Sequence, residues 1–341
     1  MACSVLIPAL QPGSGLRGVV SALAADERVR RIWLIDDGSG SEFAERFEEA
    51  AAVSEKVRLL RHPMNLGKGV ALRTGMQAFL AEREEAEVLV TADADGQHLP
   101  EDILRVAERA VECPDALVLG TRAFGEGTPL RSQFGNSLTK WVFRLLTGIS
   151  LTDTQTGLRG IPLGLMGALL RVDARRYQFE LVMLLQAFAR RFRFETVPIQ
   201  TVYLENNAAS HFNPVVDSIR IYWVFVRFAW TYLLPLLVDF AIFWLLQGWG
   251  APLGVSLLAG KAAMPGVRTL QAQLGEPDGL VRAGPRGGKL MLRVLMQTLI
   301  SGALVVLGMK TLGWSAVSAK VLAEAVIGLL KMLRFRSSGT R

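Results

Sequence analysis

Short apolar runs alternate with amphipathic stretches along the N-terminal part of the chain. Each apolar run has the length of a strand, and each stretch between two runs has the length and period of a helix. The predicted strands are 3–7, 31–35, 57–60, 87–92 and 116–120, and the predicted helices are 14–25, 41–52, 69–83 and 100–111. Strands that alternate with helices are typical of parallel βαβ units, so we predict an α/β fold.

The pattern changes near Val215, beyond which the apolar runs are much longer. Residues 228–247 carry a single charged side chain and are long enough to cross a hydrocarbon core of about 30 Å. A second strong run covers 294–309. Two weaker runs are 250–266, which carries Lys261, and 316–333, which carries Lys320 and Glu324 one helical turn apart. We predict four membrane-spanning helices, with an interfacial or core position as the alternative for the two weaker ones.

Basic residues stand before the first predicted span, between the second and third, and after the fourth. They are Arg220, Arg227, Arg268, Arg282, Arg286, Lys289, Arg334, Arg336 and Arg341. Because basic loops stay on the cytosolic side, we expect an integral protein of the inner or plasma membrane with its N-terminal part and both termini in the cytosol. Charges within a span are unfavourable in lipid, so we expect Asp239, Lys261, Lys320 and Glu324 to face the bundle interior.

An amphipathic stretch, residues 138–149, lies between the two parts. Trp141 and Leu145 stand on its apolar face, and Lys140 and Arg144 stand on the other. This period fits a core helix and equally a helix that lies in the bilayer surface. The predicted membrane part downstream favours the surface helix.

Composition supports a chain of two parts and excludes two classes of protein. The chain has 341 residues, a net charge of +7 and 50% hydrophobic residues, which is unusual for a soluble enzyme. The two cysteines, Cys3 and Cys113, and the three histidines have no metal-type spacing. We therefore expect neither a disulfide framework nor a structural zinc site.

The most informative segment is 88–97, an apolar strand that runs directly into Asp93, Asp95 and Gln97. Beyond the end of a strand the backbone turns, so two carboxylates spaced i, i+2 can converge on one hard divalent cation. Gln97 can add a carbonyl oxygen. The alternative is an acidic turn in which Asp95 or Asp102 only caps the following helix.

Two other predicted strands also end in polar loops. Asp36-Asp37-Gly38-Ser39 follows the strand 31–35, and Asn65-Leu66-Gly67-Lys68-Gly69 follows the strand 57–60. In open α/β sheets ligands bind beyond the carboxyl ends of parallel strands, so these loops share one crevice. The three loops together favour a binding site over a simple helix cap.

A competing motif is Gly13-Ser14-Gly15-Leu16-Arg17-Gly18, which has the spacing GxGxxG and is followed by Asp36 after the next strand. A dinucleotide fingerprint needs its first glycine in the tight turn directly after the strand, whereas residues 8–12 intervene here. Gly67-Lys68-Gly69 likewise lacks the upstream glycine and the following Ser or Thr of a phosphate loop. We therefore disfavour both kinds of nucleotide site.

These motifs carry a resemblance to a known family. The chain resembles a family-2 glycosyltransferase of GT-A fold. The segments that carry this resemblance are, in this order, Ile7-Pro8, Asp36–Ser39, Asn65–Gly69 and Asp93–Gln97. The family's polyprenyl-phosphate branch, which includes dolichyl-phosphate mannose synthase, is resembled by Gly120–Arg122, Asp153–Arg159, Phe179-Glu180 and Ser210–Phe212. A GtrA-like membrane domain is resembled by Leu237–Phe240 and Lys320–Glu324.

The resemblance implies a division of the chain into three parts. Residues 1–213 would form a GT-A-type, Rossmann-like mixed sheet domain, and 214–230 a juxtamembrane helix. Residues 231–336 would form an all-α, four-helix transmembrane domain of the GtrA type. Leu10-Gln11-Pro12 departs from the family pattern, which has an acidic residue there that contacts the base, so the identity of the base is open.

The resemblance also implies an activity, namely inverting transfer of one sugar from a UDP- or GDP-linked donor to a polyprenyl phosphate such as undecaprenyl phosphate. The product would serve glycosylation of the cell envelope. The expected partners are the donor, the lipid acceptor, the membrane and possible further copies of the chain, but no nucleic acid. The expected cofactor is Mg²⁺ or Mn²⁺.

Site residues follow from the same resemblance. The metal ligands implied are Asp93, Asp95 and Gln97. The residues implied in nucleotide-sugar binding are Pro8, Asp36, Asp37, Gly67, Lys68, Asp93 and Ala94. The catalytic residues implied are Asp95, Arg122, Arg131, Asp153 and Gln155, and those at the acceptor phosphate are Arg122, Arg131, Ser210 and His211.

Several of these residues have an alternative role. Asp36 faces the ribose or only caps its turn, and Lys68 contacts the nucleotide or lies on a solvated helix start. A lipid monophosphate, with a second pKa of about 6, is largely dianionic near neutral pH and needs cations such as Arg122 and Arg131 rather than a strong base. A lipid hydroxyl acceptor would need a base, for which Asp153 is the candidate.

A rival hypothesis makes the membrane domain the functional part. The chain would then be a flippase or a lipid-carrier partner with a catalytically silent soluble domain. The complete Asp93, Asp95 and Gln97 set argues against a silent domain.

Overall fold

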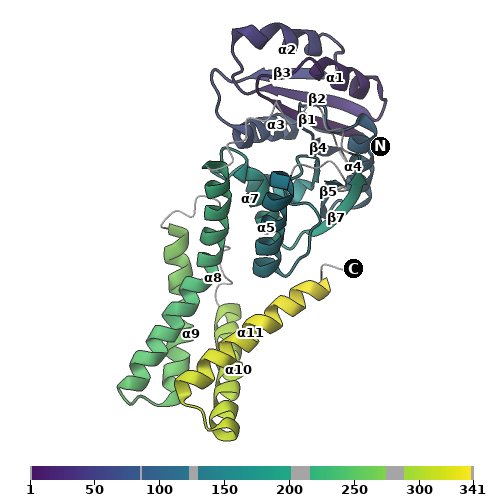
Figure 1. The fold of residues 1–341 in the computed structure, drawn as a ribbon. Coiled ribbons are helices and arrows are strands. Elements are labelled where there is room, and N and C mark those ends of the chain that lie inside the picture. Colours follow the sequence, from purple (N-terminus) through teal and green to yellow (C-terminus); the bar gives the residue numbers. More distant parts are fainter. Residues whose placement is uncertain (1, 85–86, 123–129, 201–215, 274–287, 339–341) are drawn as a thin grey trace. The chain divides into compact units, whose positions relative to one another are not determined.

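The computed structural model describes residues 2–84, 87–122, 130–200, 216–273 and 288–338 (Figure 1). The chain divides into two compact units. The first unit comprises residues 1–145 and 150–224, and the second comprises residues 146–149 and 225–341. The first contains the strands, and the second contains most of the four long C-terminal helices.

Among the described residues of the first unit, seven strands form one sheet. They are β1 (Cys3–Ala9), β2 (Val29–Asp36), β3 (Val57–Arg61), β4 (Val88–Thr91), β5 (Ala116–Arg122), β6 (Arg159–Ile161) and β7 (Arg193–Ile199). Their order is β3-β2-β1-β4-β6-β5-β7, in which β6 is antiparallel to β4 and β5 and the other pairs are parallel. The predicted α/β class and the mixed sheet are confirmed, although the apolar pattern did not reveal β6 and β7.

In the described part of the chain, seven α-helices accompany the sheet. They are α1 (Leu16–Ala25), α2 (Ala44–Ala51), α3 (Lys68–Glu82), α4 (Pro100–Glu112), α5 (Leu130–Thr147), α6 (Leu163–Leu169) and α7 (Gln178–Ala189). A 3₁₀ turn, Ser41–Phe43, precedes α2. The first four helices begin and end within three residues of the predicted bounds.

Both faces of the sheet are covered, which is why strands β1 and β4 are mostly apolar. Val5 and Ile7 of β1 join the core cluster formed with α1 and α4. Leu6, between them, points to the opposite face, where its side chain meets Gly75 of α3. Helices α1, α2 and α4 therefore cover one face and α3 covers the other, with α7 packed on α3 (Figure 1). Each fully buried Val, Leu or Ile contributes about 1.5–3 kcal/mol.

The predicted apolar face of helix α5 is only partly buried. Trp141 is 61% and Leu145 57% exposed, whereas Leu138, Val142 and Leu146 are half-buried. The helix also buries Thr139 and Phe143. Both alternatives for residues 138–149, a core helix and a helix in the bilayer surface, stay predictions.

Four long helices follow the sheet domain. They are α8 (Val216–Gly248), α9 (Leu253–Gln273), α10 (Gly288–Leu312) and α11 (Ala316–Ser338). Among the described residues, two segments are long and apolar enough to cross a membrane, Ser218–Gly248 and Leu295–Leu312. Because α8 is continuous, the predicted juxtamembrane helix 214–230 and the predicted first span belong to one helix. The boundary at residue 213 stays a prediction.

Charged side chains from α8, α9 and α11 pair with one another inside the second unit. Asp239 Oδ2 of α8 lies 2.9 Å from Lys261 Nζ of α9 and 2.9 Å from Lys320 Nζ of α11. Glu324 of α11 also contacts Lys261 and accepts a hydrogen bond of 2.9 Å from Ser301 of α10. We call Asp239, Lys261, Lys320 and Glu324 the charge cluster. The prediction that these four residues face the interior of the helical unit is confirmed.

Close packing of α8 on α9 depends on a glycine. A Cβ added at Gly260 would overlap Oδ1 of Asp239, whereas one added at Gly266 of the same helix would meet open space. We expect Gly260→Ala to lower the free energy of unfolding by about 1–3 kcal/mol through overpacking. Gly266→Ala is the matched control and is expected to be neutral or to stabilise by up to about 1 kcal/mol through helix propensity.

Thermal unfolding of the two variants in detergent tests this prediction. Equal unfolding midpoints for the two variants would contradict the close contact between Gly260 and Asp239.

Candidate active site

The order of the strands brings three loops to one edge of the sheet. Strand β1 lies between β2 and β4. Strands β2 and β3 therefore extend the sheet on one side of β1, and the chain then crosses to β4 on the other side. Ligands of open α/β sheets bind at such a point, beyond the carboxyl ends of the strands. Asp37 directly follows β2, Lys68 begins the helix after β3, and Asp93 follows β4.

Asp37 organises the loop that connects β3 to α3. Its Oδ1 accepts hydrogen bonds from the Leu66 amide (3.1 Å) and lies 2.8 Å from Nδ1 of His62, while its Oδ2 accepts from the Gly67 amide (2.8 Å). The Asp37 side chain is 4% exposed. Asp37 therefore holds the loop in place, and its implied role in nucleotide-sugar binding stays a prediction.

Two further groups at this edge have a local backbone role. Asp36 accepts a hydrogen bond of 2.9 Å from the Ser39 amide, which is the cap considered as one of its two roles. Gly67 has a φ of +101°, and a Cβ there would overlap the carbonyl oxygen of Arg175. The chain can therefore approach this closely only with glycine at position 67.

Lys68 is the centre of a charged cluster at the sheet edge. Its Nζ lies 2.6 Å from Oδ1 of Asp93 and 2.7 Å from Oε1 of Glu180, a residue of α7. The Lys68 side chain is 19% exposed and the Glu180 side chain 10%. The alternative that Lys68 lies on a solvated helix start is wrong. The sequence indicated Glu180 only as part of the family motif Phe179-Glu180.

Protonation of this cluster follows from its contacts. Burial acts to raise the pKa of the Asp93 carboxyl, but Lys68 and then His98 lower it below its usual range. Burial likewise acts to lower the pKa of the Lys68 ammonium, but Asp93 and Glu180 raise it above its usual range. Lys68 and Asp93 are thus both charged near neutral pH.

Asp95 is the exposed carboxylate of the set. Its Oδ1 accepts a hydrogen bond of 3.0 Å from the Gln97 amide. Partial desolvation and the charge of Asp93 raise the pKa of the Asp95 carboxyl. His98 is buried next to these residues, with its Nε2 3.4 Å from Oδ2 of Asp93.

The donor atoms present fit a hard divalent cation that also binds substrate oxygens. Asp93, Asp95 and Gln97 supply two carboxylates and one amide oxygen at one turn. The described residues contain no group of three or more His, Cys, Asp or Glu side chains suited to a metal ion. A site with two carboxylates is nevertheless typical of Mg²⁺, which keeps coordination positions for water and phosphate oxygens.

Asp153 and Arg122 form a second polar pair. Arg122, at the end of β5, donates from Nε to Oδ2 of Asp153 (2.7 Å) and from Nη2 to Oδ1 (3.2 Å). The Asp153 side chain is fully buried, and Oδ1 also accepts from the Gln155 amide (3.0 Å). Asp153 is therefore held as a charge partner and turn residue.

Arg159 organises the loop between Asp153 and β6. The sequence indicated it only as the last residue of the family motif Asp153–Arg159. Its side chain is buried and donates to the carbonyl oxygens of Thr156 (2.8 Å), Glu180 (2.6 Å) and Thr154 (3.2 Å). Burial lowers the pKa of this guanidinium. Carbonyl groups that are buried need a hydrogen-bond donor, and the buried Arg159 guanidinium supplies it here.

Gly157 leaves room for the carboxylate of Asp93. A Cβ at Gly157 would overlap both carboxylate oxygens of Asp93, whereas one at Gly167 would meet open space. If Asp93 acts at the site, Gly157→Ala is expected to lower the rate of sugar transfer by about a hundredfold, because small displacements of site groups have large effects. Gly167→Ala is the matched control.

Initial rates of both variants, with circular dichroism as a check on folding, measure this effect. A Gly157→Ala enzyme with the rate of the control would contradict the role of Asp93.

The remaining expected site residues are only partly described. Pro8 lies in β1 opposite Ile35 of β2, and Ala94 lies in the turn after β4. Arg131 belongs to α5, but its side chain is outside the described part of the chain. Ser210 and His211 lie outside the described residues.

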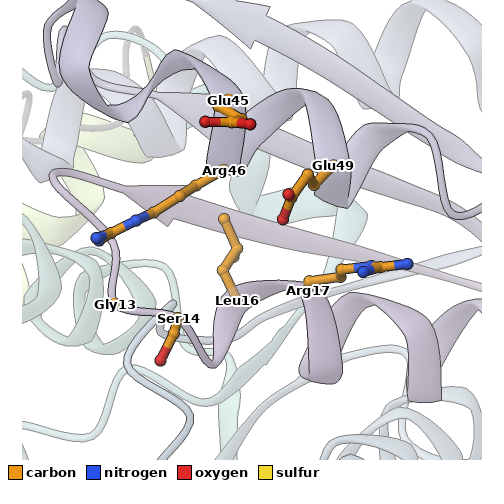
Figure 2. A pocket seen from close by; sticks show the side chains of 7 residues that line it. All are labelled: Gly13, Ser14, Leu16, Arg17, Glu45, Arg46 and Glu49. Atoms are coloured by element: carbon orange, nitrogen blue, oxygen red, sulfur yellow. The ribbon is translucent and has the colours of Figure 1, made fainter.

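The GxGxxG segment lines a pocket of a different kind. Figure 2 shows Gly13, Ser14 and Leu16 facing Glu45, Arg46 and Glu49 of α2, with Arg17 at the side. In a dinucleotide fingerprint, glycines permit close approach of the backbone to a pyrophosphate and of helix to strand. A Cβ at Gly13, Gly15 or Gly18 would meet nothing within 4 Å. The geometry agrees with the rejection of a dinucleotide site.

Comparison with known proteins supports a glycosyltransferase domain. Residues 4–159 match the family described as Glycosyl transferase family 2. The chain is 29% identical over 229 residues to the UDP-N-acetylglucosamine–dolichyl-phosphate N-acetylglucosaminyltransferase of Methanococcus voltae, covering 62% of this chain and 90% of that protein. It is 31% identical over 178 residues to the undecaprenyl-phosphate 4-deoxy-4-formamido-L-arabinose transferase of Pectobacterium atrosepticum, covering 50% of this chain and 52% of that protein.

A solved structure supports the fold alone. Glucosyl-3-phosphoglycerate synthase from Mycobacterium tuberculosis, in complex with phosphoglyceric acid, superposes with a TM-score of 0.50 and 17% sequence identity. The superposition covers 66% of this chain and 79% of that chain. It supports a GT-A-like mixed α/β domain.

Proposed function

We propose that this chain transfers one sugar, with inversion, from a UDP- or GDP-linked donor to a polyprenyl phosphate such as undecaprenyl phosphate. The observation that carries the proposal is the cluster of Asp93, Asp95 and Lys68 at the carboxyl ends of the strands, in a domain that matches family 2. The names of the two relatives, which act on dolichyl phosphate and undecaprenyl phosphate, support the acceptor class.

Asp93, Asp95 and Gln97 would hold Mg²⁺ or Mn²⁺. The bound cation would neutralise the diphosphate of the donor and so stabilise the leaving group. Asp95, which is exposed, is the carboxylate that can reach a ligand without leaving its turn. Gly67 would allow the backbone to come close to the nucleotide. Lys68 would bring its ammonium group to the nucleotide.

The class of acceptor is inferred from Asp153, the candidate base for a hydroxyl acceptor. A general base must lie within hydrogen-bond reach of the proton that it removes. Asp153, the candidate for a hydroxyl acceptor, is fully buried and bound by Arg122. A dianionic lipid phosphate needs no base, and Arg122 together with Arg131, Ser210 and His211 is proposed to bind it.

The second unit is proposed to be a GtrA-like membrane domain that keeps the enzyme at the lipid. Helices α8 and α10 contain the two candidate spans, and the charge cluster supports a bundle that buries the charges of α9 and α11. Exposed Trp141 and Leu145 of α5 suit the headgroup level of a bilayer. We propose that the catalytic domain and both termini are cytosolic and that the product serves the cell envelope.

The proposed acceptor is tested by offering undecaprenyl phosphate and undecaprenol side by side. The purified full chain in detergent receives a panel of UDP- and GDP-sugars with Mn²⁺. We expect transfer from one donor to the phosphate and none to the alcohol. Transfer to undecaprenol would instead support the hydroxyl-acceptor enzyme, and absence of any metal-dependent nucleotide binding would support a silent domain beside a lipid-carrier partner.

A further inference from the structure

Asp93, one of the proposed metal ligands, is already bound by a cation of the protein itself. The Lys68 ammonium lies 2.6 Å from its Oδ1, within the range of a short charge-assisted hydrogen bond. The other oxygen, Oδ2, faces His98 at 3.4 Å and the Cα of Gly157, where no Cβ would fit. A divalent cation that uses Asp93 must therefore compete with Lys68 for the carboxylate.

Rigid contacts fix the position of the Lys68 ammonium. Lys68 is the first residue of α3, and the amides of Gly69 and Val70 donate to the carbonyl oxygen of Arg175 (2.8 and 3.3 Å). The ammonium also contacts Glu180 at 2.7 Å, and the main chain of Glu180 is held by Arg159. Lys68 is thus placed between two carboxylates by elements that are far apart in sequence.

Two carboxylates share the Lys68 ammonium, those of Asp93 and Glu180. The exposed carboxylate of Asp95 stands two residues from Asp93 and is not among the contacts of Lys68, so it is open to a further cation. A diphosphate that enters the same edge offers Lys68 new oxygen partners. Lys68 can then release Oδ1 of Asp93 while Glu180 keeps the ammonium at the site.

We propose that Lys68 makes the binding of the divalent cation depend on the nucleotide diphosphate. Without a diphosphate, the ammonium holds Asp93 and weakens metal binding; with one, the ammonium turns to the phosphate oxygens and Asp93 becomes a ligand. Metal and donor then enter together. This inference rests on the proposed function, in which Asp93 and Asp95 hold the metal ion.

Linkage makes the proposal quantitative. If a nucleotide raises the affinity for Mn²⁺ by some factor, Mn²⁺ raises the affinity for the nucleotide by the same factor. The contribution of Lys68 is the part of this coupling that disappears when the ammonium is removed. Glu180 acts as a positioning residue, because it binds Lys68 rather than the metal ion or the donor.

The test is direct measurement of Mn²⁺ binding by electron paramagnetic resonance, with and without UDP or GDP. We expect Lys68→Met to bind Mn²⁺ about tenfold more tightly than the wild type when no nucleotide is present, with a correspondingly smaller coupling to the nucleotide. Lys56→Met is the matched control, because the Lys56 ammonium donates to the carbonyl oxygens of Ala24 and Asp26 and not to a carboxylate of the proposed metal site. A damaged fold does not explain tighter binding.

Glu180→Gln gives a result of the opposite sign. Without the charge of Glu180, the Lys68 ammonium rests on Asp93 alone, so Mn²⁺ without nucleotide is expected to bind about threefold more weakly than in the wild type. A Lys68→Met variant that binds Mn²⁺ no more tightly than the wild type would overturn the inference, as would a Glu180→Gln variant that binds it more tightly.

Asp95→Ala separates failure of this inference from failure of the proposed function. Loss of Mn²⁺ binding in Asp95→Ala, together with no gain in Lys68→Met, would overturn the role of Lys68 alone. Unchanged Mn²⁺ binding in Asp95→Ala would remove the metal site itself, and the proposed function with it.

Discussion

Asp95→Ala is expected to lower sugar transfer at least about a thousandfold, which corresponds to about 4 kcal/mol of transition-state stabilisation. The donor diphosphate must be neutralised as it leaves, and Asp95 is the exposed carboxylate of the proposed metal site. Its described contact is with the Gln97 amide in its own turn, so the fold is expected to change by no more than about 0.5 kcal/mol.

Initial rates with a radiolabelled donor measure the effect of Asp95→Ala. Asp173→Ala is the matched control, because Asp173 is an exposed aspartate whose described ion pair, with Arg175, is 3.6 Å long. The control is expected to keep the wild-type rate. An Asp95→Ala enzyme within tenfold of the wild type would contradict the metal site.

Asp239→Asn is expected to destabilise the second unit by about 3–5 kcal/mol, because it leaves the two buried lysines with the single carboxylate of Glu324 and one uncompensated positive charge. Asp239 and Lys320 are fully buried, and Oδ2 of Asp239 contacts the ammonium groups of both Lys261 and Lys320 at 2.9 Å. The unfolding midpoint in detergent is expected to fall by at least about 10 °C.

A second substitution distinguishes loss of charge balance from loss of packing. Asp239→Asn with Lys320→Met restores neutrality and leaves the pair of Lys261 and Glu324. We expect the double variant to be more stable than Asp239→Asn alone, a coupling that a double-mutant cycle measures. Lys310→Met, at an exposed lysine, is the control. Simple additivity of the two changes would contradict an electrostatic role for the cluster.

Most of the strands predicted from the sequence bury both faces, and the edge strand β3 is the exception. Strands β1, β2 and β4 lie inside the sheet and read as apolar runs, which the periodicity detects directly. Strand β7 lies at the sheet edge, alternates exposed and buried positions and contains Pro198, which an edge tolerates. Strand β6 has three residues, too few for any periodic signal.

The amphipathic pattern of helix α5 did not predict which of its side chains are buried. The apolar side of a helix predicts the buried side only when water is the alternative environment. Here Trp141 and Leu145 are exposed, and the helix buries Thr139 and Phe143. An exposed apolar face is what a membrane surface requires, so the pattern identified the helix but not what its apolar face contacts.

The candidate site was predictable where a strand end identifies it. Asp93, Asp95 and Lys68 follow strands, and the topology brings them to one edge. Glu180 has no such signal, because it stands in the apolar helix α7 far along the chain. A lone carboxylate in a buried helix must have a cationic partner, but the sequence does not say that the partner is Lys68.

Transfer of a sugar from a nucleotide to a polyprenyl phosphate is the activity proposed for this chain. The most direct measurement is transfer of radiolabelled sugar from UDP- and GDP-linked donors to undecaprenyl phosphate by the full chain in detergent, with Mn²⁺ or with EDTA. We predict a lipid product from one donor that is labile in mild acid and is lost with EDTA. Absence of product from every donor, by folded protein that binds nucleotide, would contradict the proposed activity.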